Sequence, residues 1–163
     1  MKRLFLFFLL SVTGQLLFAQ VDTSLLYLRF PVVPPFSITK VPDSIKFVKD
    51  DLKRKTATII MVFSPDCEHC QHETNELLAH IDLFKNTQII MASPIDFAAI
   101  KKFYIDYRIA DYPNIIMGRD PSYFLGTFFH IRSFPALFVY DKKGNFVKAF
   151  DGSVPVERVA QEL

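Results

Sequence analysis

The chain has 163 residues, of which 50% are hydrophobic and 22% are charged, and its formal net charge is +2. This length is typical of one domain, and the apolar content is sufficient for a substantial core. The net charge is too small, and the Lys and Arg residues are too scattered, for a nucleic-acid-binding surface, so that class of function is excluded.

Residues 1–19 have the pattern of a secretory signal. Lys2 and Arg3 form a short basic region, a wholly apolar run follows at 4–10, and the predicted cleavage site precedes Gln20. The apolar run is short for a membrane span, but an uncleaved signal would leave the protein anchored in the membrane. We therefore predict an exported protein, periplasmic or otherwise extracytoplasmic, in a compartment where disulfides persist.

The region before the first predicted strand is rich in proline. Residues 20–35 contain three prolines, which favours an extended N-terminal segment over a helix. Apolar and polar residues alternate at 36–39 and at 45–48, which predicts a β-hairpin whose first strand lies at a sheet edge. No internal repeat or long linker divides the chain beyond this point, so we assign residues 36–163 to one domain.

The only two cysteines, Cys67 and Cys70, lie between a predicted strand and a predicted helix. Residues 56–63 are mostly apolar and β-branched, which is typical of a strand buried on both faces. Apolar residues recur at near-helical spacing over 73–84, so Cys67 falls at the start of a helix and Cys70 in its first turn. Unpaired backbone N–H groups and the helix dipole favour a thiolate there. We predict Cys67 as the nucleophile and Cys70 as the resolving thiol.

Three alternatives to redox chemistry apply to two cysteines at this spacing. A structural disulfide across so short a loop would stabilise the fold little in the loop-entropy model. A zinc or copper site could use His69 or His72, but zinc usually needs four ligands and there is no second cysteine pair. The third alternative is chance spacing. The competing function is copper handling, with Cu(I) bound by Cys67, Cys70 and a distant histidine such as His130, although His130 is more simply a loop residue.

Charged side chains flank the predicted nucleophile. An imidazole at His69 would stabilise the Cys67 thiolate and make the protein more oxidising. Asp66 and Glu68 act in the opposite sense, because a carboxylate next to a thiolate repels it. The sequence therefore predicts an intermediate reduction potential, modulated by these three residues.

Glu73 stands three residues after Cys70 and lies on roughly the same face of the predicted helix. Its carboxylate, if partly desolvated, could accept the proton that the resolving thiol must lose. The ordinary alternative is an idle acid in the first helical turn, where a negative charge is favourable with the dipole.

Further strands and helices alternate along the rest of the chain. A second buried strand at 87–92 implies a parallel crossover, and Pro94 opens the next helix, whose aromatic stripe we assign to the core. Pro135 opens the first strand of a β-hairpin that turns at Gly144. The remaining expected elements are a short strand at 114–117 and helices at 120–129 and 155–163. This alternation places the chain in the α/β class.

Three motifs in this order resemble the thioredoxin superfamily, and most of all the bacterial extracytoplasmic thiol-disulfide oxidoreductases of the TlpA/ResA type. They are the Cys-Glu-His-Cys sequence at 67–70 after a buried strand, Glu73, and Phe134-Pro135 at the start of a strand. The resemblance implies a thioredoxin-like fold, with a central mixed β-sheet flanked by helices, and a redox-active disulfide between the two cysteines. It also implies that Pro135 is cis, faces the pair and, with Phe134, binds the partner.

The chain departs from the family pattern at two places. The family commonly has a tryptophan before the first cysteine, where this chain has residues 63–66, and often a small or β-branched residue where Phe134 stands. Both positions border the expected partner groove. The resemblance further favours a reductase, and we expect it to be a monomer without a cofactor or metal. It would act on protein disulfides of the cell envelope and take electrons from a membrane or periplasmic donor.

Overall fold

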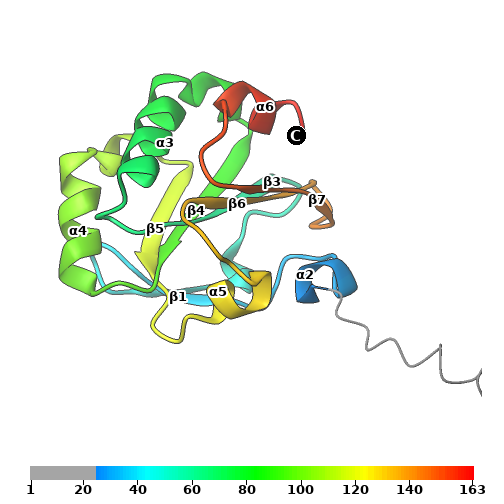
Figure 1. Cartoon of the computed structure of the whole chain (residues 1–163), viewed down its shortest axis with the longest axis horizontal. Coiled ribbons are helices and arrows are strands. Elements are labelled where there is room, and N and C mark those ends of the chain that lie inside the picture. Colours follow the sequence, from blue (N-terminus) through cyan, green and yellow to red (C-terminus); the bar gives the residue numbers. More distant parts are fainter. Residues whose placement is uncertain (1–24) are drawn as a thin grey trace, which may run out of the picture.

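A computed structural model describes residues 25–163, and its centre is one mixed sheet of seven strands (Figure 1). The strand order is β2-β1-β5-β4-β3-β6-β7. Strands β3, β4 and β5 run parallel, and the other pairs are antiparallel. The strands are β1 (Ser37–Lys40), β2 (Lys46–Val48), β3 (Ala57–Val62), β4 (Thr87–Ser93), β5 (Ile115–Arg119), β6 (Ala136–Tyr140) and β7 (Phe146–Asp151). This confirms the predicted α/β class and the mixed central sheet.

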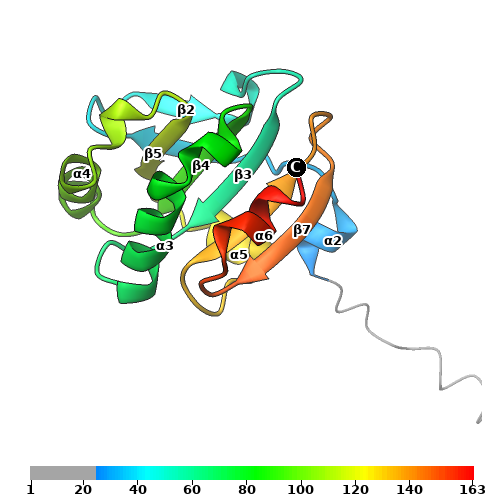
Figure 2. The ribbon, with the colours of Figure 1, turned by 90° about the horizontal axis from the view of Figure 1, so that it is seen from above.

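Helices cover both faces of the sheet (Figures 1 and 2). α3, α4 and α6 pack on one face, and α2 and α5 pack on the other. The α-helices are α2 (Leu26–Arg29), α3 (Glu68–Ala79), α4 (Phe97–Asp106), α5 (Phe124–Phe129) and α6 (Val156–Ala160). Short 3-10 helices are η2 (Lys49–Asp51), η3 (Ile81–Phe84) and η4 (Ile109–Asp111). Within residues 25–163, no helix has both the length and the apolar character that crossing a membrane requires.

Strand β3 is the middle of the core, and every one of its six residues is buried. Met61 pairs with Met91 of β4 on one side and with Leu137 of β6 on the other. Because side chains alternate across a strand, Met61 faces the layer of α3 and α4, whereas Ile60 faces α5. A β-branched apolar run buried on both faces explains why the strand was predictable, and it fixes the position of the loop that follows.

The helix after this loop is shorter than predicted. α3 begins at Glu68, directly after Cys67, as expected, but it ends at Ala79 rather than continuing to residue 84. His80 leaves the helical conformation, with φ −113° and ψ 28°, and a 3-10 turn follows. The change of direction still buries Phe84 completely, so the apolar spacing that suggested one long helix is satisfied by two elements.

The N-terminal segment is not wholly extended as predicted, because Leu26–Arg29 forms one helical turn. Tyr27 holds this turn by packing edge-on against Phe138 and Phe146, with ring centroids 5.4 and 5.2 Å apart. The three prolines begin only at Pro31, so nothing in the preceding residues opposes a helical turn. The predicted signal at 1–19 lies outside the described residues.

Two further predictions about element position were wrong. β1 is not an edge strand, because β5 pairs with it on the side opposite to β2. α4 does not begin at Pro94. Asp96 caps it instead, accepting hydrogen bonds from the N–H groups of Ala98 and Ala99 at 2.7 and 3.2 Å. The hairpin of β1 and β2, the parallel pair β3 and β4, and the hairpin of β6 and β7 are confirmed.

Candidate active site

The two cysteines lie where the central strand β3 passes into α3 (Figure 2). Cys67 is half-buried, Cys70 is completely buried, and both are free thiols. Cys67 is the N-cap of α3, and its Sγ accepts a hydrogen bond from the Cys70 N–H at 3.3 Å. A sulfur in this position accepts from the unpaired N–H groups at the helix start, an arrangement that favours the thiolate.

The loop before β6 supplies the second wall of the site. The Phe134–Pro135 peptide bond is cis, which confirms the prediction, and a second cis bond occurs at Val41–Pro42, which was not predicted. The Cys67 thiol donates to the Phe134 carbonyl oxygen at a sulfur–oxygen distance of 3.5 Å. Residues 67 apart in the chain are thus brought into contact, with both Phe134 and Cys67 half-buried.

Cys70 is a poor nucleophile in its resting state. Its burial raises the pKa of the thiol far above the ordinary range, and the adjacent Cys67 sulfur and the Glu73 charge raise it further. The thiol is therefore protonated at neutral pH, and it needs a proton acceptor before it can attack a disulfide.

Glu73 is a buried carboxyl group, with only 1% of its surface exposed. Its Oε2 accepts a hydrogen bond from the Val154 N–H at 3.0 Å, while its Oε1 has no partner among residues 25–163. Burial raises the pKa of this carboxyl group above its usual value, although the hydrogen bond opposes the shift. Glu73 lies in the second turn of α3, so the alternative of a first-turn acid does not describe it.

The three predicted modulating residues, Asp66, Glu68 and His69, are all exposed around Cys67. The structure thus brings every predicted site residue to one end of the sheet, while their roles stay predictions.

Two residues that the sequence did not suggest also belong here: Ser153 donates its hydroxyl to the His69 carbonyl at 3.0 Å, and Val154 binds Glu73. These contacts span more than 80 positions, and no local sequence signal indicates them.

The His69→Ala variant tests the influence of this exposed imidazole. We expect the reduction potential to fall, by on the order of 10–30 mV, because a group that stabilises the thiolate stabilises the reduced protein. Equilibration with a glutathione buffer measures the potential. His72→Ala, also exposed on α3, is the control and should leave the potential unchanged. An unaltered potential in His69→Ala would show that the imidazole has no part in tuning the pair.

The histidine invoked for the copper alternative is engaged elsewhere. His130 is exposed, and its Nε2 lies 3.2 Å from the Arg132 guanidinium. Within the part of the chain that the structure describes, no three His, Cys, Asp or Glu side chains converge closely enough to hold a metal ion. Among the described residues, His130 therefore does not form the three-ligand group with Cys67 and Cys70 on which that alternative depended.

Solved structures with a similar fold come from several bacteria. A secreted disulfide oxidoreductase of Mycobacterium tuberculosis has a TM-score of 0.65 and 14% identity, over 78% of this chain and 93% of that protein. An exposed lipoprotein thioredoxin of Streptococcus pneumoniae has a TM-score of 0.60 and 20% identity, over 80% and 100%. StoA of Bacillus subtilis has a TM-score of 0.57 and 16% identity, over 80% and 97%. At these identities the similarity shows the fold alone.

The sequence itself gives the family. No curated protein matches the chain in sequence at a significant level. A family model, the thioredoxin-like domain, matches residues 44–163, which include both cysteines, Glu73 and the Phe134–Pro135 loop. With the strand–cysteine–helix junction, the cis-proline and the mixed sheet already described, this match shows that the chain belongs to the thioredoxin-like family.

Proposed function

We propose that the protein is an exported thiol-disulfide oxidoreductase that reduces disulfides of other proteins. The observation that carries the proposal is the asymmetry of the two thiols. Cys67 is half-buried and its Sγ accepts a hydrogen bond from the Cys70 N–H, whereas Cys70 is buried beside a buried carboxyl group. An accessible thiol at a helix N-terminus and a shielded one that stays protonated are suited to attack and to resolution, respectively.

The reaction then proceeds in two exchanges. The Cys67 thiolate attacks one sulfur of the partner disulfide, which forms a mixed disulfide and releases the other partner sulfur as a thiolate that takes up a proton. Cys70 loses its proton to Glu73 and attacks the Cys67 sulfur, which releases the second partner sulfur as a thiolate that also takes up a proton. Two electrons pass to the partner, and Cys67 and Cys70 are left as a disulfide.

The Phe134 backbone would hold the partner during this exchange. Its carbonyl oxygen already accepts from the Cys67 thiol, and the half-buried residue borders the sulfur. An extended partner strand could pair with such main-chain groups while its own sulfur reaches Cys67.

Export is supported by two separate lines, and the reducing direction is what the resemblance to the TlpA/ResA type favours. The pattern at residues 1–19 is that of a secretory signal, and proteins with a similar fold include a secreted oxidoreductase and an exposed lipoprotein. A reductase in an oxidising compartment needs a membrane or periplasmic donor to reduce its own disulfide again. Rapid alkylation in cells should then find Cys67 and Cys70 mainly as thiols, whereas a mainly oxidised pair would indicate an oxidase.

A trapping experiment tests the chemistry. The Cys70→Ser variant should accumulate mixed disulfides between Cys67 and partner proteins, because the resolving thiol is gone. Mass spectrometry of the disulfide-linked species identifies the partners, and the variant with both cysteines replaced by serine is the control. If Cys70→Ser is well expressed in the cell envelope and traps nothing above that control, the proposed function is wrong.

A further inference from the structure

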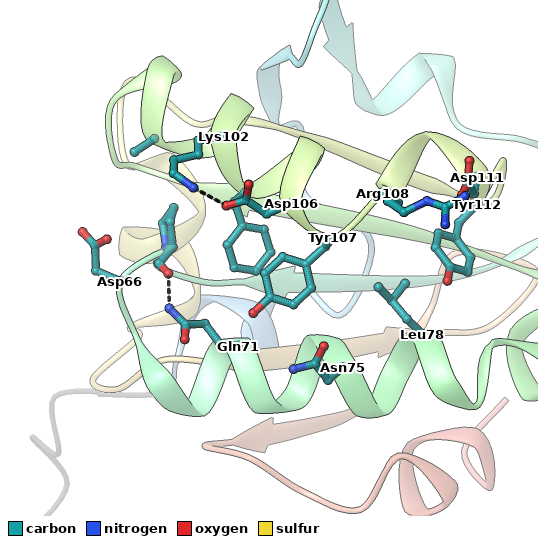
Figure 3. A pocket seen from close by; sticks show the side chains of 13 residues that line it. Asp66, Gln71, Asn75, Leu78, Lys102, Asp106, Tyr107, Arg108, Asp111 and Tyr112 are labelled. Carbon is teal, nitrogen blue, oxygen red and sulfur yellow. Dashed lines mark hydrogen bonds and ion pairs between the residues drawn. The ribbon is translucent and has the colours of Figure 1, made fainter.

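A groove of about 730 Å³ lies between α3 and α4 and begins beside the cysteine pair (Figure 3). Pro65 and Asp66, the two residues before Cys67, form its near end, and Leu78 and Tyr112 lie at the opposite end. Gln71 fixes the near end by donating a hydrogen bond from its Nε2 to the Pro65 carbonyl at 2.8 Å. The groove is therefore continuous with the loop that presents the nucleophile.

The floor of the groove is aromatic. Phe103 is buried, and the ring of Tyr107 stacks on it with a centroid distance of 4.2 Å. The Tyr107 hydroxyl points across the groove toward α3, between Gln71 and Asn75 (Figure 3). Burial raises the pKa of this tyrosine, so the hydroxyl stays protonated and remains a hydrogen-bond donor. Rings and amide groups together suit an apolar side chain and the backbone of an extended peptide.

Charges are distributed unevenly along the groove. Along its α4 side, Lys102 pairs with Asp106, and Arg108 pairs with Asp111 at 2.7 Å, so these four groups largely neutralise one another. Asp66 at the near end is exposed and forms no ion pair within residues 25–163. Glu68, equally exposed and equally without an ion pair in that range, flanks the same sulfur. Asp66, the one of these two acids that lines the groove, thus gives its near end a negative charge, which favours a cationic neighbour.

The length of the groove sets the size of its occupant. From Gln71 to Leu78, α3 advances about 10 Å at the helical rise of 1.5 Å per residue. An extended chain rises about 3.3 Å per residue, so about three residues fit along the groove.

We infer that this groove binds the extended segment of a partner protein next to the cysteine that Cys67 attacks, with a Lys or Arg near Asp66 and an aromatic or apolar side chain on the ring floor. This inference rests on the proposed function, because it concerns which disulfides react fastest and leaves the exchange chemistry unchanged. The groove would then favour protein disulfides with a basic and an aromatic residue within about three positions of the cysteine.

Two neighbouring alanines of α4 provide a matched test. Ala99 lines the groove, whereas Ala98 is exposed and does not line it. Stopped-flow measures the rate of reduction of two kinds of disulfide. The first kind, the tailed peptides, carries Lys next to the cysteine and Phe two positions further, on either the N- or the C-terminal side. The second is bis(2-hydroxyethyl) disulfide, which is too small to fill the groove. Ala99→Phe should lower the rate at which one of the two tailed peptides is reduced by about tenfold, which is equivalent to about 1.4 kcal/mol. Ala98→Phe should not slow either peptide.

Two further variants test the groove in case Ala99→Phe does not fold. Asn75→Trp fills the groove from the exposed side of α3, away from the sulfurs. It should also lower the rate of reduction of the tailed peptide and leave the rate for the small disulfide unchanged. Asp66→Asn should reduce the ratio of the reduction rates of two peptides, one with Lys and one with Glu next to the cysteine. If Ala99→Phe and Asn75→Trp slow reduction of the small disulfide as much as that of the peptide, or slow the reduction of neither substrate, the groove does not bind the partner. If the wild type fails to reduce even the small disulfide, the proposed function itself is wrong.

Discussion

The Cys67→Ser variant should lose disulfide reductase activity by about 10³-fold or more, because a serine hydroxyl does not ionise near neutral pH and cannot attack a disulfide. Cys70, buried and with a strongly raised pKa, cannot replace it. Stopped-flow reduction of a fluorescent peptide disulfide measures the loss. The hydroxyl should still cap α3, since serine is among the preferred N-cap residues, so the fold is retained.

The complementary variant separates the two exchanges. Cys70→Ser should still attack the same peptide once, with a first-exchange rate near that of the wild type, and then stop at the mixed disulfide. Equal loss of the first exchange in both variants would contradict the assignment of Cys67 as the nucleophile. A Cys67→Ser protein that keeps a tenth or more of wild-type activity would contradict it as well.

The Glu73→Gln variant should slow resolution of the mixed disulfide by about 10- to 100-fold, the range expected when a general base is lost. The attack by Cys67 should be unaffected, because that sulfur is stabilised by the Cys70 N–H and not by the carboxylate. Resolution should also become less dependent on pH, since the group that takes the proton no longer titrates. Quenched-flow separation of the mixed disulfide, from about pH 5 to 9, follows both effects.

Glu76→Gln, a half-buried carboxylate on the next turn of α3, is the matched control for this measurement. It should keep fast, pH-dependent resolution, because the general base is still present, with the pH dependence moved to lower pH since the Glu76 charge contributes to the raised pKa of Glu73. Equal resolution rates in Glu73→Gln and the wild type across this pH range would exclude Glu73 as the proton acceptor.

Stability provides an independent readout of the same carboxyl group. Because burial raises its folded-state pKa above the ordinary value of 4.5, the protonated form suits the folded protein better than the charged one. The contribution of Glu73 to the free energy of unfolding is therefore fully present below pH 4.5 and is lost as the pH rises through the raised value. Urea unfolding should show a smaller fall over this interval in Glu73→Gln, whose amide oxygen can still accept from Val154.

The parts of the fold that local patterns determine were predicted from the sequence. The run at 56–63 became β3, and the turn at Gly144 closed the hairpin of β6 and β7. Only some of the errors arose where distant contacts decide the outcome. The turn at Leu26–Arg29 depends on three phenylalanines far along the chain. The break at His80 and the start of α4 after Asp96 are local, and the apolar spacing alone does not reveal them.

The candidate site shows the same division. The spacing of Cys67, Cys70 and Glu73 is a local property of one strand–helix junction, so the sequence could bring these three residues together. The burial of Glu73 and its bond to Val154 depend on where β7 and α6 return to the sheet. The groove between α3 and α4 likewise belongs to two elements whose relative placement the sequence does not state.

The bond between the Val154 N–H and the Glu73 carboxylate also makes the site observable without any added probe. An amide proton that donates to a charged oxygen resonates differently from one that donates to a neutral acid, because the bond to the charged acceptor is shorter and stronger. The nitrogen–proton correlation signal of this single residue therefore reports the charge of a buried carboxyl group 81 positions earlier in the chain. A spectrum of the ¹⁵N-labelled protein can follow the proton at Glu73 while the two sulfurs exchange, in the unmodified protein.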